Sequence, residues 1–274
     1  MTRPTGSSQP EPAPLILLTN DDGIASPGLC ALVEAVADLG EVLVVAPRHQ
    51  QSSTGRALGR VGPLQREALA ANGHRVMAYS VEATPASAVR AGILLAARRP
   101  VSLVIAGINY GENMGTGVTV SGTVGCAIEA ASYGIPSIAI SLETDAEHHF
   151  SYSEVVDFTV AAAVACRLAR HALSHPFPGG ADVLKVDVPS DAALDTPWRL
   201  TRLTRQRYYE PAVTAGPDGL PRLSGYYRHV DATTLEPDSD AQALLVDRVV
   251  SVCPLTIDLS AGFTREGADG WLDL

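Results

Sequence analysis

The 274-residue chain has few aromatic residues, only four cysteines and no long apolar run. Phe, Trp and Tyr make up 5% of the sequence, so the core has to be built mainly from Ala, Val, Leu and Ile, as in a parallel sheet covered by helices. No stretch approaches the roughly 20 apolar residues of a membrane-spanning helix, which predicts a protein without a membrane span. The cysteines form no Cys-x-x-Cys pair, which indicates buried free thiols in a reducing compartment.

The chain also lacks an excess of basic residues, since its net charge is −10. A protein that binds a nucleic-acid polymer needs a basic face, so the charge argues against such a partner. A small phosphorylated ligand is not excluded, because a bound divalent cation can reverse the potential locally. Residues 1–14 contain Pro, Ser, Thr and Gly without an apolar signal core, which predicts a disordered leader on a cytoplasmic protein.

Short apolar runs alternate with helix-like segments over residues 15–197. Strands are predicted at 15–19, 41–46, 75–81, 101–106, 137–142 and 181–188, and helices at 28–39, 85–98, 124–133 and 153–173. This alternation predicts an α/β fold with a mostly parallel sheet. Residues 198–248 are rich in tyrosine and turn pairs, which predicts a β-rich extension or hairpin arm used in oligomer contacts. An apolar run at 249–255 predicts that residues 249–274 return to the body.

Two adjacent carboxylates follow the first predicted strand, in Asn20-Asp21-Asp22-Gly23. Each carboxylate raises the cost of ionising the other, and a hard cation such as Mg²⁺ or Mn²⁺ relieves that cost because it takes oxygen ligands. An ordinary turn, with one aspartate capping the next helix, explains the tetrapeptide equally well.

Polar loops follow two further predicted strands, at residues 51–55 and 107–109. Ligands bind at the carboxyl ends of parallel strands, so these loops are expected to converge with the aspartate pair. The Ser52 hydroxyl and the Asn109 amide oxygen are suitable neutral ligands for a hard cation, and they would leave positions for water and a substrate oxygen. Each residue alone has a plain interpretation as a loop or turn residue.

A Ser/Thr- and Gly-rich segment, Ser121-Gly122-Thr123-Val124-Gly125, leads into a predicted helix. Backbone amides at the start of a helix, together with hydroxyl groups, predict a phosphate site, although a simple Ser/Thr cap has the same sequence. The segment lacks the lysine of a P-loop, so hydrolysis of nucleoside triphosphates is not supported.

These motifs together resemble the SurE family. The likeness spans residues 15 to about 261 and rests on segments 17–24, 44–47, 51–52, 106–115, 121–124, 134–141 and 250–255, which occur in the family's order. The resemblance implies a Rossmann-like body and a homodimer or homotetramer with swapped C-terminal elements. It also implies metal-dependent hydrolysis of phosphate monoesters, typically nucleoside 5′- or 3′-monophosphates, by a nucleotidase or acid phosphatase.

The resemblance assigns roles position by position. One divalent ion per subunit, Mg²⁺ or Mn²⁺, would be held by Asp21, Asp22, Ser52 and Asn109. The substrate would contact Asn20, Asn113, Ser121, Gly122 and Thr123. Asp21 and Asn109 would be catalytic, with Asp21 acting on the attacking water or as the nucleophile. For the leaving-group acid only His49 and His229 are weak candidates, and neither lies in a motif.

The chain also departs from the family pattern. Gln50 ends a segment where the family commonly has Asp-Arg, Ser53 replaces a glycine so that either serine could be the ligand, and Lys185-Val186-Asp187 replaces Asn-Val-Asn. No departure removes a predicted metal ligand. They make a specialised phosphatase, acting on a phosphorylated sugar or a biosynthetic intermediate, the main alternative. A glycosyltransferase that holds a nucleotide sugar through the metal, and a nucleotide-binding protein without turnover, are further alternatives.

Overall fold

The computed structural model describes residues 12–71, 74–150, 152–153 and 155–260. A nine-stranded sheet forms the centre of the molecule, in the order β3-β4-β2-β1-β5-β6-β7-β11-β8. All neighbouring strands are parallel except the pairs β3–β4 and β7–β11. The strands are β1 (Leu15–Thr19), β2 (Glu41–Pro47), β3 (Gln65–Ala71), β4 (His74–Val81), β5 (Leu103–Tyr110), β6 (Ser137–Leu142), β7 (Val183–Val188), β8 (Trp198–Leu200) and β11 (Val250–Leu255). The predicted mostly parallel α/β fold is confirmed.

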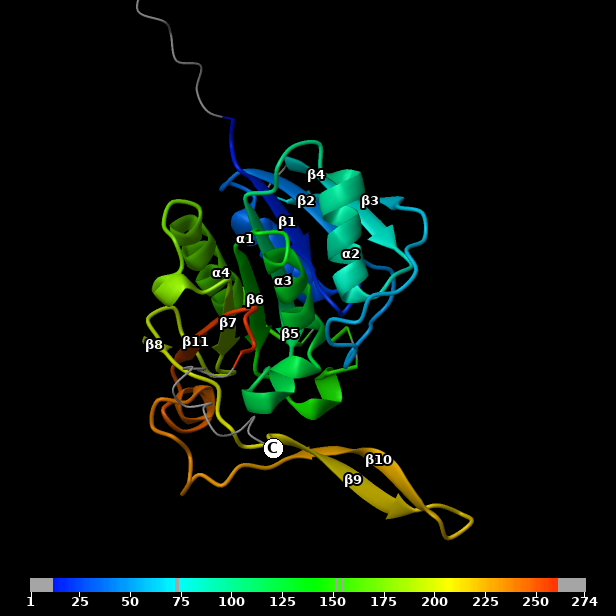
Figure 1. The fold of residues 1–274 in the computed structure, drawn as a ribbon, viewed down its shortest axis with the longest axis vertical. Helices are drawn as coiled ribbons and strands as arrows, with labels where there is room; N and C mark the ends of the chain where they lie inside the picture. Colours follow the sequence, from blue (N-terminus) through cyan, green and yellow to red (C-terminus); the bar gives the residue numbers. More distant parts are fainter. Residues whose placement is uncertain (1–11, 72–73, 151, 154, 261–274) are drawn as a thin grey trace, which may run out of the picture.

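Helices cover both faces of this sheet (Figure 1). The helices are α1 (Pro27–Val36) and α4 (Thr159–Ala172) on one face, and α2 (Pro85–Ala91) and α3 (Gly122–Ala131) on the other. Successive side chains of a strand point to opposite faces, so Ile16 and Leu18 pack toward α1 and α4, whereas Leu15 and Leu17 pack toward α2 and α3. Burial on both faces explains why the central strands read as continuous apolar runs.

Five short 3₁₀ or π segments complete the helical structure of the described residues. They are η1 (Gly92–Ala96), η2 (Gly115–Thr119), η3 (Ala146–His148), η4 (Pro178–Gly180) and η5 (Gln242–Val246). Within the described ranges no helix is long and apolar enough to cross a membrane. All four cysteines are free thiols, but of the four thiols predicted to be buried only Cys126 and Cys253 are, whereas Cys30 and Cys166 are partly exposed.

Some predicted strand boundaries were wrong. The strand predicted at 101–106 continues to Tyr110, because Asn109 and Tyr110 pair with β6 beyond an irregularity that starts after Ala106. The sequence also gave no indication of β3, whose residues contain none of the β-branched types that favour strands. β3 is an edge strand that pairs only with β4, so long-range hydrogen bonding forms it rather than local propensity.

Some predicted helix boundaries were wrong as well. The helix predicted at 153–173 begins only at Thr159, whose N–H donates to the side chain of Asp157 just before the first turn. The helix predicted at 85–98 ends as an α-helix at Ala91 and continues as η1. Helix α3 begins at Gly122 rather than at 124, with Ser121 as its N-cap. Segment η5 was not foreseen in the predicted β-rich region.

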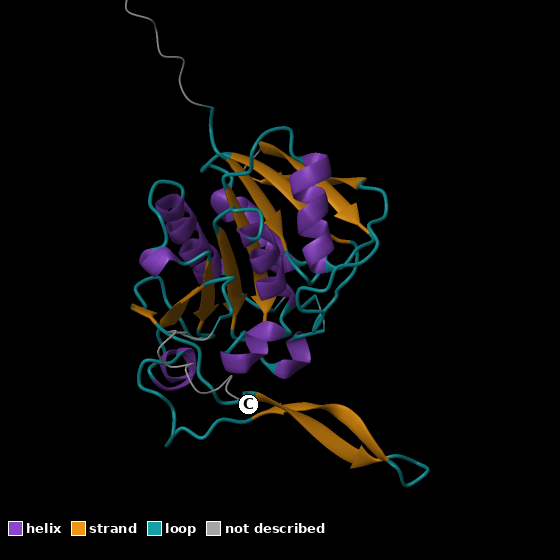
Figure 2. Cartoon of the chain, in the orientation of Figure 1, coloured by secondary structure: helices purple, strands orange, loops and turns teal. Residues whose placement is uncertain are grey.

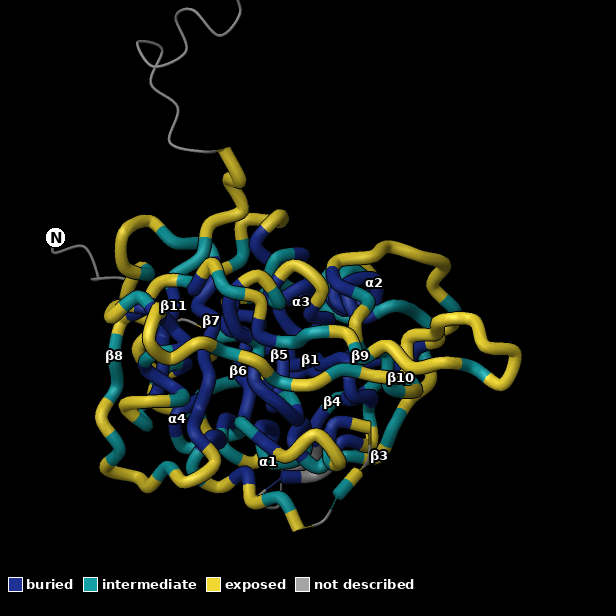
Figure 3. The backbone as a smooth tube through the Cα atoms, turned by 90° about the horizontal axis from the view of Figure 1, so that it is seen from below, coloured by how far each residue is buried: buried dark blue, intermediate teal, exposed yellow. Residues whose placement is uncertain are grey.

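The predicted hairpin arm is present. Strands β9 (Tyr209–Ala215) and β10 (Pro221–Arg228) form a separate two-stranded antiparallel sheet that projects from the body (Figure 2). Most of its outer residues are exposed, in contrast to the buried central strands (Figure 3). Of the predicted leader, residues 1–11 lie outside the described residues, as do residues 261–274 of the predicted C-terminal segment.

Candidate active site

The polar loops that were predicted to converge follow strands β1, β2 and β5, which are neighbours in the sheet. β1 lies between β2 and β5 in the sheet, so the carboxyl ends of these parallel strands meet at one edge. The chain goes from β1 to β2 on one side and returns to β5 on the other, which makes this the switch point where α/β sheets bind ligands. A cavity of about 550 Å³ opens here. The predicted site residues that line it are Asp21, Ser52, Asn109, Asn113, Ser121 and Gly122.

Asp21 lies against the first turn of α3. Its Oδ1 accepts a hydrogen bond from the Thr123 hydroxyl, and Gly122 packs so closely that a Cβ there would lie 2.6 Å from Asp21 Oδ2. The Asp21 backbone oxygen accepts a hydrogen bond from the Gln51 N–H at 2.7 Å, which ties the β1 and β2 loops together. Burial raises the pKa of the Asp21 carboxyl to about 6, an effect that the Thr123 hydrogen bond partly offsets.

Asp22 is buried and is not part of the cavity lining. Its Oδ1 is 3.0 Å from Gln50 Nε2, and its Oδ2 accepts a long hydrogen bond of 3.4 Å from the Tyr110 N–H. Burial, and then the charge of Asp21, raise the Asp22 pKa well above its usual value. Two adjacent buried carboxyls with raised pKa values fit a cation, because a bound cation removes the cost of ionising both.

Asn20 and Thr123, two of the predicted substrate contacts, also lie outside the cavity lining. Asn20 closes the turn after β1, since its Nδ2 donates to the Gly23 oxygen at 3.0 Å and its Oδ1 accepts from the Gly23 N–H at 3.1 Å. The Thr123 hydroxyl is engaged by Asp21. Substrate contact by the side chains of these two residues therefore stays a prediction, while their visible contacts hold Asp21 in place.

The neutral ligand candidates have geometry suited to a cation. Both N–H groups of the Asn109 amide point to backbone oxygens, those of Tyr110 at 3.1 Å and Gly111 at 2.6 Å, which leaves Oδ1 as the atom available to a ligand. Ser52 Oγ is 3.1 Å from the Gln50 nitrogen that also contacts Asp22. Among the described residues no three His, Cys, Asp or Glu side chains gather as a metal site, so a cation here depends on these neutral oxygens.

Gln50 also belongs to the site, although in the sequence it was noted only as a departure from the family pattern. Its Nε2 lies within hydrogen-bond distance of Asp22, Ser52 and the backbone oxygen of His149. A single amide therefore links the two candidate ligands to a segment almost 100 residues later in the chain. No local sequence signal marks this position, because its partners come together only in the folded protein.

The predicted phosphate side of the cavity is formed by α3 and the loop after β5. Ser121 caps the helix by accepting a hydrogen bond of 3.1 Å from the Val124 N–H, so the first-turn amides of Gly122 and Thr123 have no acceptor within the helix. Asn113 is fixed through its Nδ2, which donates to Ser141 Oγ at 2.8 Å, and through its N–H, which donates to Asp187 at 2.8 Å. These groups make a ready anion site beside Asp21.

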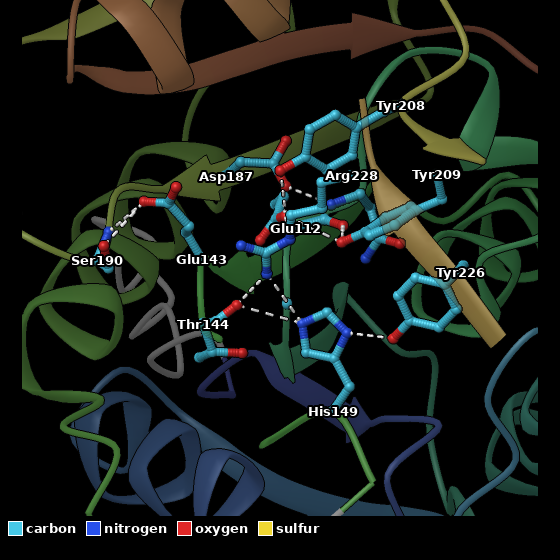
Figure 4. A network of polar contacts seen from close by, with 12 residues as sticks. Glu112, Glu143, Thr144, His149, Asp187, Ser190, Tyr208, Tyr209, Tyr226 and Arg228 are labelled. Carbon is cyan, nitrogen blue, oxygen red and sulfur yellow. Dashed lines mark hydrogen bonds and ion pairs between the residues drawn. The ribbon is translucent and has the colours of Figure 1, made fainter. Parts of the chain in front are cut away.

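An aromatic side of the cavity was missed by sequence reasoning. It consists of His149, Phe150, Tyr208, Tyr209 and Tyr226, most of which Figure 4 shows around Glu112 and Arg228. Burial, followed by the charge of Arg228, lowers the pKa of His149, and its two ring nitrogens contact Tyr226 Oη and the Thr144 oxygen. The tyrosine-rich composition of the arm was the available signal, but it was interpreted as an oligomer contact. His49 and His229, the two histidines considered from sequence, do not line the cavity.

Comparison with known proteins places this geometry in a family. A family model described as Survival protein SurE matches residues 16–210. A relative from Thermococcus gammatolerans, named 5′-nucleotidase SurE, is 46% identical over 249 residues, covering 90% of this chain and 91% of the relative. A relative of the same name from Thermococcus kodakarensis is 44% identical over 248 residues, covering 90% and 93%.

Structural comparison agrees. A crystal structure described as SurE protein from Aquifex aeolicus matches with a TM-score of 0.73 and 30% sequence identity, over 94% of this chain and 98% of that chain. The resemblance inferred from the spaced motifs is confirmed, and this chain belongs to the SurE family.

Proposed function

We propose that this protein is a phosphoric monoester hydrolase that releases phosphate from nucleoside 5′- or 3′-monophosphates with the help of a divalent cation. The relatives named 5′-nucleotidase SurE support this activity. The observation that carries the proposal is the position of Asp21, a buried carboxylate that faces the cavity directly beside the N-terminal turn of α3. A carboxylate next to an anion site is an arrangement suited to hydrolysis of a phosphate ester.

One Mg²⁺ or Mn²⁺ ion per subunit would be held by Asp21, Asp22, Ser52 and Asn109. When bound, such an ion offsets charge on the phosphoryl oxygens and lowers the pKa of a coordinated water. The adjacent carboxyls with raised pKa values, and the Asn109 oxygen left available, support this ligand set. Ser52 is favoured over Ser53 because Gln50 links it to Asp22.

Residues of the chain itself would bind the phosphate and act on the attacking water. The first-turn amides of Gly122 and Thr123, with Ser121 and Asn113, would bind phosphoryl oxygens. Glu112, the other acidic residue of the lining, is occupied by Tyr208 and Tyr209, so Asp21 is the carboxylate available to act on water. In hydrolysis the water oxygen bonds to phosphorus and a proton of the water passes to Asp21, while the bond to the ester oxygen breaks and the departing alcohol oxygen takes up a proton from solvent.

The test is phosphate release from nucleoside 5′- and 3′-monophosphates, ribose 5-phosphate and p-nitrophenyl phosphate, with Mg²⁺, with Mn²⁺ and with a chelator. Asp21→Asn keeps the shape of the side chain and removes its charge. We expect it to lower kcat by at least about 10²-fold, the scale that positioned acid–base groups contribute. Asp195→Asn, an exposed carboxylate outside the cavity lining, should keep the wild-type rate.

Release that is unaffected by the chelator, or equal rates for both variants, would contradict the proposal. Fastest release from a phosphorylated sugar would instead support the specialised phosphatase. Binding of nucleotides by the metal-loaded protein without any release would indicate a binding protein.

For the arm we propose oligomer contacts in a homodimer or homotetramer with swapped C-terminal elements. The arm exposes large apolar side chains, with Val213 62% and Leu223 76% exposed, which favours burial against a second copy of the chain. Light scattering after gel filtration should give a multiple of the subunit mass of 28.6 kDa. A monomer at micromolar concentration would contradict this assembly.

A further inference from the structure

The loop that brings Asn113 to the cavity has little regular structure of its own. Asn113 and Met114 line the cavity but belong to no helix or strand, and Gly115 is the first residue of η2. We call residues 113–115 the phosphate loop, because Asn113 is among the groups assigned to the phosphoryl oxygens. Such a segment keeps one conformation only if contacts from other parts of the chain offset the loss of its conformational entropy.

Two buried carboxylates hold the backbone of this loop. The Asn113 N–H donates to Asp187 Oδ1 at 2.8 Å, and the Gly115 N–H donates to Asp240 Oδ2 at 2.9 Å. Lys185 Nζ donates to the second oxygen of Asp187 and to the same Asp240 oxygen that Gly115 contacts. All three side chains are at most 1% exposed, and none of them lines the cavity. We call Lys185, Asp187 and Asp240 the carboxylate clamp.

Asp240 also joins the loop to both ends of the hairpin arm. Its Oδ1 accepts hydrogen bonds from the Thr204 N–H at 2.8 Å and the Ala241 N–H at 2.9 Å. Thr204 precedes β9 and Ala241 follows β10, so one carboxylate contacts the chain before the arm, the chain after it and the phosphate loop. The packing is close, since Gly115 has a φ of +51° and a Cβ there would lie 2.7 Å from Thr204 Cγ2. A shift of the loop therefore has to break several contacts at once.

The side chains of the loop are fixed as well. Asn113 Nδ2 donates to Ser141 Oγ at 2.8 Å, and Ser141 lies beside Asp187 in the register of β6 and β7. Met114 is fully buried and packs in a small apolar cluster with Tyr208, Leu235, Ala241 and Leu244. The contacts of Asn113 in the described part of the chain use one N–H of its amide, which leaves the other N–H and Oδ1 for a ligand.

Charge balance alone does not explain the clamp. One carboxylate would neutralise Lys185, yet two are buried beside it, and burial of a further charge is unfavourable. This burial raises the pKa of Asp187 to about 6, an effect that Lys185 only partly offsets. What each carboxylate does separately is to accept the N–H of one residue of the phosphate loop. Lys185 and Asp187 also stand where the family pattern has Asn-Val-Asn, so the resemblance does not imply this clamp.

We propose that Lys185, Asp187 and Asp240 are positioning residues, which fix the phosphate loop so that Asn113 meets the phosphoryl group already in place. The inference rests on the proposed phosphatase function, because it takes the phosphate to bind at Asn113. Groups held in position before binding lose little conformational freedom when the ligand arrives, so the clamp raises the affinity for phosphate and for phosphorylated substrates. A loop released from the clamp has to be ordered again by each ligand that binds, and the affinity falls accordingly.

Asp187→Asn is the sharpest test. The carboxylate has one oxygen for each of its two donors, the Asn113 N–H and Lys185 Nζ, whereas an amide has a single oxygen. The ammonium takes that oxygen, because charge-assisted hydrogen bonds are the stronger ones, and the amide NH₂ then faces the Asn113 N–H. Lys185 and Asp240 remain as a balanced ion pair, so the variant is expected to fold, which a circular dichroism melt checks.

The first measurement is calorimetric binding of inorganic phosphate with Mg²⁺, which needs no turnover. A buried N–H left without its acceptor should weaken binding roughly 5- to 150-fold, so the Kd for phosphate should rise by a factor in that range. KM for a nucleoside 5′-monophosphate should rise in parallel while kcat changes little, as expected for a contact made equally in substrate and transition state. Asp182→Asn is the matched control and should leave Kd and KM unchanged. Asp182 directly precedes the same strand, accepts the Ile257 N–H at 2.8 Å and lies outside the cavity lining.

The second measurement is hydrogen–deuterium exchange of the metal-free protein, with mass spectrometry of the peptide that contains the phosphate loop. Its amides should exchange at least about tenfold faster in Asp187→Asn than in the wild type or in Asp182→Asn. The double variant Lys185→Asn with Asp187→Asn recreates the Asn-Val-Asn of the family pattern. Without the ammonium, the amide oxygen can return to the Asn113 N–H, so the affinity for phosphate should recover at least in part.

An unchanged Kd for phosphate in folded Asp187→Asn, or an equal rise in Asp182→Asn, would overturn the positioning role. A fall in kcat with an unchanged Kd, unchanged exchange of the loop, or a double variant that binds phosphate as weakly as the single one would overturn it too. Wild type that binds phosphate but hydrolyses no ester would contradict the phosphatase proposal alone, and the variants would still decide the role of the clamp. Ester hydrolysis by a wild type that binds no phosphate would support the phosphatase and overturn the clamp.

Discussion

Lys185 is the only lysine in the chain and lies fully inside it. It sits on β7 two residues before Asp187, so both side chains point to the same face of the sheet. Its Nζ donates to Asp187 Oδ2 and, at 2.8 Å, to Asp240 Oδ2. Burial alone would lower the Lys185 pKa, but the two carboxylates outweigh it and the pKa is raised. The ammonium is therefore charged at every physiological pH.

We expect Lys185→Met to destabilise the protein strongly, because it leaves Asp187 and Asp240 buried without their cation. Breaking a buried ion pair from one side costs about 3–5 kcal/mol. Both carboxylates keep backbone N–H partners, from Asn113 at 2.8 Å and Gly115 at 2.9 Å, which places the loss near about 3 kcal/mol. For a chain of this length the melting temperature should fall by about 2 °C per kcal/mol, so by about 6 °C.

The assay is urea unfolding of wild type and variants followed by circular dichroism, from pH 5 to pH 8. Burial already raises the pKa of Asp187 to about 6 beside Lys185, and loss of the lysine charge raises it further. The variant is therefore least impaired at low pH, and its deficit grows as pH rises through the raised pKa of Asp187. The double variant Lys185→Met with Asp240→Asn removes one uncompensated carboxylate and should regain part of the loss. A loss below about 1 kcal/mol, or a double variant no more stable than the single one, would refute this reasoning.

Three further outcomes follow from the site. Gly122→Ala should lower kcat/KM roughly 10- to 100-fold, because the new Cβ would lie 2.6 Å from Asp21 Oδ2. Gly59→Ala is the control and should keep the wild-type kcat/KM, because the nearest atom to its new Cβ is 3.5 Å away. Equal losses of kcat/KM in the two variants would contradict the prediction. In metal-free protein the raised Asp21 pKa of about 6 means that protonation favours folding, so stability should fall by up to about 3 kcal/mol between about pH 4 and pH 7. Thermal melts in chelator should show that the stability of Asp21→Asn depends less on pH than that of the wild type, and Mg²⁺ should restore the stability that the wild type loses at pH 7. Parallel plots of stability against pH for the two proteins would contradict this prediction. Ser52→Ala should raise the metal concentration that gives half-maximal activity about tenfold or more, and Ser53→Ala should raise it much less. A larger effect of Ser53→Ala would instead identify Ser53 as the ligand.

Much of the fold could be predicted because its causes are local. The run Leu15 to Thr19 is buried at every position, and an uninterrupted apolar run of that length has few alternatives to a central parallel strand. The polar residues after β1, β2 and near the end of β5 were predicted to converge because parallel strands present their carboxyl ends on one edge. Strand β3 escaped prediction because its pairing with β4, rather than its residue types, determines its conformation.

For the candidate site too, some features could be predicted from the sequence and others depend on the folded structure. The sequence by itself indicated the aspartate pair, the neutral oxygens and the Ser/Thr- and Gly-rich segment 121–125, since each lies at a recognisable element boundary, whereas the exact start of α3 was placed two residues too late. Only the tertiary structure decided that Asp21 lines the cavity while Asp22 contacts Gln50 and the Tyr110 N–H outside the lining, because the direction of a side chain depends on what packs around the turn. Only the tertiary structure brought the arm's tyrosines and His149 to the cavity, across almost 80 residues of chain. Contacts between segments that distant arise from packing and long-range hydrogen bonding, and no local pattern in the sequence encodes them.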